Sequence, residues 1–197
     1  MIAVADLEAA ARELETRHGL ASIEGGRHAG WGTANRIVPL GDTYLELIAV
    51  VDEQEAAGSV FGSWVARAGP VLAQPLGWAV RTHELDDVAA RLGLTVTAGS
   101  RPTADGRVLR WRVAGLDQSA ADPSLPFFLA WERGTPFPGR ARASDMRIAE
   151  VEVGGDPDRL ADWLGPHDLP LAIRPGTPAV RSVRLAGLGG EVVVPAG

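Results

Sequence analysis

Three polar side chains in one stretch of the chain have the chemistry of a reactive or binding site. His28, Asn35 and Glu46 lie within residues 25–50, which read GGRHAGWGTANRIVPLGDTYLELIAV. An imidazole transfers protons near neutral pH, and a carboxylate acts as a base or a metal ligand. The same residues also have structural interpretations, in which His28 caps backbone groups, Asn35 holds a loop and Glu46 pairs with an arginine at a sheet edge. The residue types alone leave both interpretations open.

The position of Glu46 is informative because it is the one charge in an apolar run. Residues 43–50 are predicted to form a strand, in which Tyr44, Glu46 and Ile48 share a face. An unpaired charge in a dry interior costs too much free energy to be tolerated. We therefore expect Glu46 either at an edge in water or inside a cavity with a partner.

Tryptophan is abundant, with 6 residues in a chain of 197. We predict that several tryptophans line a cavity for an apolar or aromatic ligand, and Trp31, Trp78 and Trp131 are the candidates for contacts with that ligand. Trp111 lies between two arginines and is expected to be partly exposed, at a dimer face.

Other aromatic and histidine residues have structural interpretations. Core packing is the better interpretation for Trp64 and Trp163. His18 is expected at the C-terminus of a helix, His83 at a solvated helix start and His167 in an exposed turn. The four histidines have no spacing typical of a metal site.

The composition excludes several classes of function. The chain has no cysteine and no lysine, which excludes disulfides, thiolate chemistry and a lysine Schiff base. The net charge is −6 and no basic run is present, so we expect no nucleic-acid partner. Apolar runs fall far short of the roughly 20 residues that cross a membrane, so we expect no membrane partner. A cytoplasmic location fits the absence of cysteine and of a signal-peptide pattern.

Hydrophobic periodicity and capping residues predict alternating strands and helices. Helices are expected over residues 6–18, 52–68, 84–92 and 156–165, the second interrupted by Gly58 and Gly62. Strands are expected over residues 1–4, 34–40, 43–50, 76–82, 94–97, 107–113, 127–131, 147–153, 170–173, 180–185 and 191–194. Residues 25–32, 99–106 and 115–126 are predicted to be loops because glycine, proline and polar residues gather there.

The order of these elements repeats three times as strand, helix and two or three strands. We therefore predict an α+β fold of tandem βαβββ modules that form curved mixed sheets around a cavity. Two modules, residues 1–69 and 76–134, make up the region 1–134. Residues 145–197 form a third, βαβββ-like C-terminal unit packed on that region.

This pattern resembles the vicinal oxygen chelate superfamily, which includes glyoxalases, extradiol dioxygenases and bleomycin-resistance proteins. More narrowly, GGRHAGWGTAN followed by RIVPLGDTYLELIAV resembles the bacterial glyoxalase-like domain family. The resemblance extends to VADLEAAARELETRHGL and to PFFLAWE, and so covers most of the chain. It implies a cavity between paired modules, and homodimerisation.

The resemblance also implies a metal held by His or Glu from the first and last strands of two modules. Glu46 matches the last-strand carboxylate of the first module, whose first-strand histidine position lies before Met1, as though the start were trimmed. In the second module the first-strand position falls near Trp78, which cannot bind a metal. Residues 127–131 offer no ligand before Glu132.

Two functions remain open from the sequence. One is a metal-dependent lyase, isomerase or dioxygenase for a small oxygen-bearing molecule, with one divalent Fe, Zn, Ni or Mn ion. In it Glu46 is a metal ligand or base, His28 acts with it, and Asn35 orients the substrate. The alternative is a metal-free protein that sequesters a hydrophobic small molecule in a Trp-lined cavity. A scaffold whose sheet edges serve only dimerisation is a weaker third.

Overall fold

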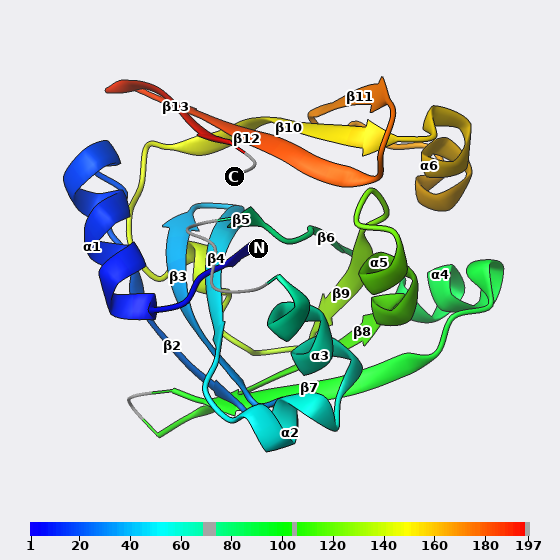
Figure 1. The fold of residues 1–197 in the computed structure, drawn as a ribbon, viewed down its shortest axis with the longest axis horizontal. Coiled ribbons are helices and arrows are strands. Elements are labelled where there is room, and N and C mark those ends of the chain that lie inside the picture. Colours follow the sequence, from blue (N-terminus) through cyan, green and yellow to red (C-terminus); the bar gives the residue numbers. More distant parts are fainter. Residues whose placement is uncertain (69–73, 104–105, 196–197) are drawn as a thin grey trace.

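The computed structural model describes residues 1–68, 74–103 and 106–195, and its elements form three successive βαβββ units (Figure 1). The first unit contains β1 (Ile2–Ala3), α1 (Leu7–His18), β2 (Ile23–His28), β3 (Thr33–Leu40) and β4 (Thr43–Val50). It is followed by α2 (Glu53–Ala57), α3 (Val60–Arg67) and β5 (Gln74–Pro75). Asp6 caps α1 by accepting a hydrogen bond from the Ala9 amide, and Gly19 ends the helix at a φ of 67°.

The later units repeat this order with small additions. The second unit contains β6 (Ala79–Arg81), α4 (Leu85–Leu92), β7 (Val96–Pro102), β8 (Val108–Ala114), α5 (Leu116–Ala121) and β9 (Phe127–Trp131). A 3-10 turn, η1 (Pro138–Arg140), precedes the third unit. That unit contains β10 (Arg147–Gly155), α6 (Pro157–Leu164), β11 (Leu171–Pro175), β12 (Ala179–Gly187) and β13 (Gly190–Pro195). The α+β class with repeated βαβββ units is therefore confirmed.

Strand order distinguishes the third unit from the first two. The first sheet has the order β2-β3-β4-β1-β5 and the second β6-β9-β8-β7. In both, the first strand of the unit pairs in parallel with its last strand. The third sheet has the order β11-β10-β12-β13, so its first strand is central and pairs in parallel with β11 instead.

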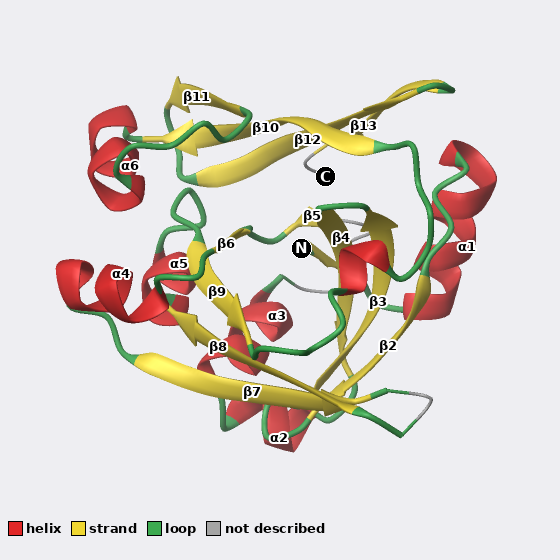
Figure 2. Cartoon of the chain, turned by 180° about the vertical axis from the view of Figure 1, so that it is seen from behind, coloured by secondary structure: helices red, strands yellow, loops and turns green. Residues whose placement is uncertain are grey.

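The first sheet separates two hydrophobic cores. One core joins α1 and one face of the first sheet to the third sheet, which lies across the others in Figure 1. The second core joins the opposite face of the first sheet to α3 and the second sheet. On the outside, α4 covers the second sheet, and its apolar side chains form one cluster with Trp163 and Leu164 of α6. The two helices lie on the same side of the molecule in Figure 2. The side of the first sheet that faces the second sheet is the side on which a cavity opens.

Two predicted glycine-rich loops are largely strands. β2 continues through Gly26 to His28, because these residues pair with β3 across a bulge, and only residues 29–32 form the turn. β7 continues through Gly99 to Pro102, where it pairs with β8. Glycine lowers strand propensity without forbidding a strand, and pairing along the whole neighbouring strand outweighed it here. The predicted loop over residues 115–126 contains α5, and the strand expected over residues 76–82 is limited to β6.

The predicted helix over residues 52–68 is two helices with separate caps. Asp52 caps α2 by accepting from the Glu55 amide, and Ser59 caps α3 by accepting from the Gly62 amide. The break falls at Gly58, whereas Gly62 lies inside α3. No helix in the described part of the chain has the length and apolar character needed to cross a membrane.

Candidate functional site

A cavity of about 340 Å³ lies between the first two sheets, and seven of the side chains that line it are aromatic. They come from the β2–β3 turn, β4, α3, β8, β9 and the segment before η1. They are Trp31, Tyr44, Phe61, Trp111, Phe127, Trp131 and Phe137. Several rings contact one another edge-on or tilted, with centroids 4.9 Å apart for Trp31 and Phe61 and 5.4 Å apart for Trp111 and Trp131. The walls are therefore packed before any ligand arrives.

The alternation of β4 places its polar side chains in this cavity. Leu45, Leu47 and Ala49 face the core beneath α1 and the third sheet. Tyr44 and Glu46 face the other way and line the cavity. β3 pairs with β4 without a bulge, so Asn35 lies near Glu46, and its Nδ2 donates a 2.6 Å hydrogen bond to Glu46 Oε1. The carboxylate is thereby fixed in direction at the cavity surface.

His28 ends β2 and its ring is almost fully enclosed. Its Nδ1 lies 2.9 Å from the hydroxyl of Thr33, and its ring makes edge contacts with Trp31, Phe61 and Trp111. Its Nε2 lies 3.9 Å from Glu46 Oε1. Burial lowers the pKa of His28, Glu46 raises it in opposition, and Arg101 lowers it further. The imidazole is therefore neutral at pH 7, with Nε2 directed toward Glu46.

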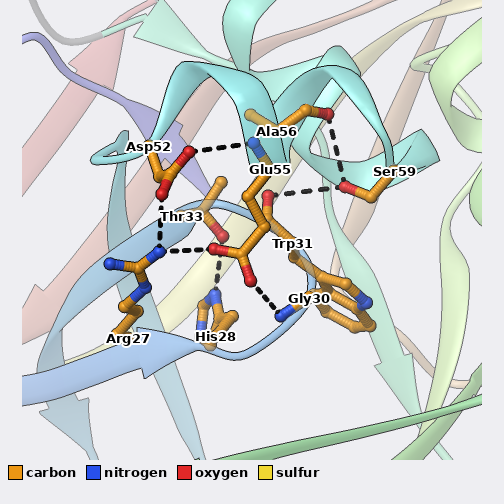
Figure 3. A network of polar contacts seen from close by, with 9 residues as sticks. All are labelled: Arg27, His28, Gly30, Trp31, Thr33, Asp52, Glu55, Ala56 and Ser59. Atoms are coloured by element: carbon orange, nitrogen blue, oxygen red, sulfur yellow. Dashed lines mark hydrogen bonds and ion pairs between the residues drawn. The ribbon is translucent and has the colours of Figure 1, made fainter.

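A surface network holds the turn that carries His28 and Trp31 (Figure 3). Arg27 on β2 donates to Asp52 and Glu55 at the start of α2, at 3.0 and 2.5 Å. Glu55 also accepts from the amide of Gly30 at 2.5 Å. These groups are exposed, so the network contributes to position more than to stability. It fastens the β2–β3 turn to α2 and so fixes one wall of the cavity.

The burial of the His28 imidazole predicts how the stability of the protein depends on pH. Below about pH 6.5, His28 is protonated in the unfolded chain but stays neutral in the folded protein. The free energy of unfolding therefore falls as the pH drops from this value toward the lowered pKa of the folded state. Urea unfolding measures the free energy of unfolding at about pH 7.5 and at about pH 5.5. We expect it to fall less between these values for His28→Gln than for the parent. His83 is exposed, so His83→Gln should show the same fall as the parent. Equal slopes for His28→Gln and the parent would contradict the burial of His28.

The second sheet contributes a cation to the cavity. Arg101 on β7 lines the cavity with only 4% of its surface exposed, and its Nη1 donates to the carbonyl of Gly25 on β2. Burial lowers the pKa of Arg101, while Glu46 and Tyr44 raise it in opposition. Burial also raises the pKa of Tyr44, so its phenol stays neutral. The polar part of the cavity therefore combines a carboxylate, a guanidinium, a phenol and a neutral imidazole.

The segment before the third unit borders the cavity. Phe137 contacts Tyr44 and Trp131, with ring centroids 5.7 and 6.4 Å apart, and the guanidinium of Arg81 lies 4.3 Å from the Phe137 centroid. Gly139 and Arg140 bond to the β3–β4 turn. The amide of Gly41 donates to the carbonyl of Gly139 at 2.9 Å, and Arg140 pairs with Asp42. Residues 137–140 therefore tie the hairpin of Glu46 to the chain entering the third unit.

The structure brings most of the residues singled out from the sequence to one place. His28, Trp31, Asn35, Glu46 and Trp131 all line the cavity. Trp78 does not belong with them: its side chain packs against the core below the third sheet, and its indole nitrogen donates to the carbonyl of Ser124 at 3.0 Å.

Several lining residues were missed or misplaced, and three of them are informative. Trp111 is 7% exposed and faces the cavity, so its expected partial exposure is wrong. The alternation of residues 107–113 already placed it on the apolar face with Leu109 and Val113. Arg101 was assigned to a loop, and Phe137 falls between the predicted units 76–134 and 145–197. Neither has a local sequence signal, since both reach the cavity through contacts between distant segments.

The donor set fits a resident metal poorly. Among residues 1–68, 74–103 and 106–195, no group of three or more His, Asp or Glu side chains is placed to hold a metal ion. His28 and Glu46 supply two donors, whereas catalytic zinc sites use three protein ligands. We therefore derive no chemistry through the divalent ion that the superfamily resemblance implies.

Comparisons with known proteins bear on the family and the fold. A family model described as a glyoxalase-like domain matches residues 1–167. The crystal structure of a hypothetical protein from Staphylococcus aureus has a TM-score of 0.66 and 16% identity, over 85% of this chain and 82% of that chain. A search of curated proteins gave no match.

Two methylmalonyl-CoA epimerases also show likeness. The enzyme from Mycobacterium tuberculosis has a TM-score of 0.44 and 24% identity, over 72% of this chain and 88% of its own. The Streptomyces coelicolor enzyme, solved as a variant in complex with 2-nitronate-propionyl-CoA, has a TM-score of 0.45 and 19% identity, over 70% of this chain and 94% of its own. Likeness at these values does not identify a substrate for this chain.

Proposed function

Because the chain belongs to the glyoxalase-like domain family of the vicinal oxygen chelate superfamily, we propose that its cavity binds a small molecule with a planar apolar body and a polar end. The observation that carries this proposal is the joining of seven aromatic side chains and the Asn35–Glu46 pair in one cavity. Aromatic walls with a few fixed polar groups are typical of small-molecule sites.

The size and lining of the cavity suit such a ligand. A volume of about 340 Å³ accommodates one or two fused rings with a short substituent. Each Å² of apolar ligand surface removed from water contributes about 25 cal/mol, and edge contacts between rings add about 0.5–1.5 kcal/mol. The body of the ligand supplies the affinity, and the polar groups set its orientation.

Glu46 is the group that orients the ligand. Asn35 donates to Oε1, so the remaining lone pairs of the carboxylate accept from a ligand N–H or O–H. The neutral His28, with Nε2 directed toward the same oxygen, accepts or donates according to its tautomer. A ligand donor therefore bonds Glu46, and it also bonds His28 in the tautomer whose Nε2 carries no proton.

A catalytic role is the second candidate, and one observation favours it. Glu46 and His28 converge at 3.9 Å in a cavity with apolar walls, as a base and a proton-transfer partner do. In that case the protein is an isomerase or lyase in which Glu46 removes a proton from the bound molecule. Elemental analysis of protein purified without chelator tests the metal-dependent version. Near-stoichiometric Fe, Zn, Ni or Mn that is lost in Glu46→Ala would support that version, although His28 and Glu46 supply only two donors.

Two half-buried tryptophans provide a matched test of the binding proposal. Trp131 lines the cavity and Trp78 packs outside it. With the neutral probe 2-naphthamide, we expect saturable binding that Trp131→Leu weakens roughly tenfold, because a ring contact of about 1.4 kcal/mol is lost. Trp78→Leu should bind the probe like the parent. Isothermal titration calorimetry measures the affinity of each variant for the probe. The proposal would be overturned if the parent did not bind the probe, or if the two substitutions weakened binding equally.

A further inference from the structure

Arg101 is a buried cation that makes no direct ion pair with a carboxylate in the described part of the protein. Its guanidinium donates to one backbone carbonyl, that of Gly25. Within the described ranges no carboxylate forms an ion pair with it inside 4.0 Å. Exposed arginines elsewhere, such as Arg112 with Asp86 and Arg140 with Asp42, do have carboxylate partners. The arginine for which a partner matters most is thus left with a neutral carbonyl.

The backbone of β2 brings Arg101 to the cavity. A Cβ on Gly26 would lie 3.5 Å from Nη1 and 3.6 Å from Cδ of Arg101, and 2.9 Å from the carbonyl of Pro102. Glycine at this position therefore lets the side chain lie closely along the strand. A larger side chain would press against β7 and the arginine it carries.

The surrounding charges favour one added negative charge. Glu46 and Tyr44 act on the pKa of Arg101, yet the Glu46 carboxylate is bonded to Asn35 rather than to the guanidinium. Arg81 adds a second guanidinium to the cavity lining, and the nearby Asp42 is paired with Arg140. Asp42 also lines the cavity, and once its pair with Arg140 is set aside, two guanidinium groups of the lining face one carboxylate, that of Glu46. An isolated buried charge is costly, and a ligand anion removes that cost.

We propose that Arg101 is the anion-binding residue of the cavity and that the ligand is a planar, largely apolar carboxylate. Its carboxylate pairs with Arg101, its rings contact the tryptophan walls, and a donor group faces Glu46. A carboxylate fits better than a phosphate dianion, since the Glu46 charge lies nearby and repels a second negative charge. Among the described residues none accepts from Nε or Nη2 of Arg101, which leaves the planar guanidinium able to make a two-point contact. This inference rests on the proposed binding function and names its ligand class.

A pair of probes with the same rings separates charge from shape. We would titrate 2-naphthoate and 2-naphthamide into the parent protein, Arg101→Met, Arg101→Lys and Arg110→Met. Arg110 is the matched control, since its side chain is 57% exposed on the neighbouring strand. We expect the parent to bind 2-naphthoate about tenfold or more tightly than 2-naphthamide, because a charge-assisted pair forms out of water. Arg101→Met should remove this preference, so that the ratio of the two affinities falls to about one.

The remaining variants keep the test decisive. Arg101→Lys retains the charge without the planar fork, so its preference for 2-naphthoate over 2-naphthamide should be smaller than that of the parent. If Arg101→Met does not fold, Arg101→Lys is the variant that tests the proposal. Arg110→Met should keep the full preference. Equal binding of the two probes to the parent, or a preference that survives in Arg101→Met, overturns this inference and leaves the binding function standing. Absence of binding by both probes overturns the two together.

Discussion

Replacing Trp111 with alanine is expected to lower the free energy of unfolding by about 3–5 kcal/mol, the largest loss we anticipate for one side chain of the cavity. Its ring contacts His28, Trp31 and Trp131 with centroids 5.7, 6.0 and 5.4 Å away. It also covers Gly99, where a Cβ would lie 2.4 Å from the indole nitrogen. Removal of the ring leaves a void over Gly99 of β7 that opens into the cavity.

Urea unfolding followed by circular dichroism measures this loss, with Arg110→Ala as the control. Arg110 precedes Trp111 on the opposite, exposed face of β8, so its replacement should change stability by less than about 0.5 kcal/mol. Trp111→Ala should also weaken 2-naphthamide binding, since one wall is gone. A stability loss below about 1 kcal/mol would show that Trp111 is not packed as the structure has it.

The second large effect is expected at Gly62, where alanine should destabilise the protein by about 2–3 kcal/mol. Helix propensity alone predicts the opposite sign, a gain of about 1 kcal/mol for Gly to Ala inside a helix. A Cβ on Gly62 would lie 2.3 Å from the carbonyl oxygen of Trp31 and 2.5 Å from Cα of Ala56. Both neighbours are backbone atoms, so α3 must move away from α2 and from the turn beside the cavity.

Gly58 supplies the matched control four residues earlier. It ends α2 at a φ of −82°, and the nearest atom to a Cβ added there would be a carbonyl oxygen 3.4 Å away. Gly58→Ala should therefore leave the free energy of unfolding within about 0.5 kcal/mol of the parent. Thermal and urea unfolding of the two variants give the comparison. A stabilised Gly62→Ala would mean that helix propensity outweighs the close approach of the Trp31 backbone.

Local patterns in the sequence predicted the elements that carry most of the candidate site. The alternation in residues 43–50 placed Tyr44 and Glu46 on one face, and the structure turns that face toward the cavity. The predicted helices over residues 6–18 and 84–92 end where the structure has the caps Asp6, Gly19 and Gly93, because capping depends on neighbouring backbone groups alone. Features set by a few adjacent residues are the ones a single sequence can show.

Features set by distant contacts were not predictable in the same way. The glycines of β2 and β7 suggested loops, yet each strand pairs with a neighbour, and Arg101 of β7 reaches back to Gly25 of β2. The central place of β10 in the third sheet is equally invisible, since element order there matches the other units while pairing differs. Trp78 was placed at the site by its position in the second unit, but its indole found a partner in Ser124 instead.

The unbroken pairing of β3 with β4 limits how the gene for this protein can change. Thr33 to Leu40 pair one by one with Val50 to Thr43, so gain or loss of a single codon in β4 reverses every later side chain. Glu46 would then face the leucine core, and a leucine would enter the cavity. Insertions or deletions at the Gly41 turn are also disfavoured, because they would break the bonds of this turn to Gly139 and Arg140. We expect homologues with different ligands to differ here by substitution at constant length, with insertions confined to other loops.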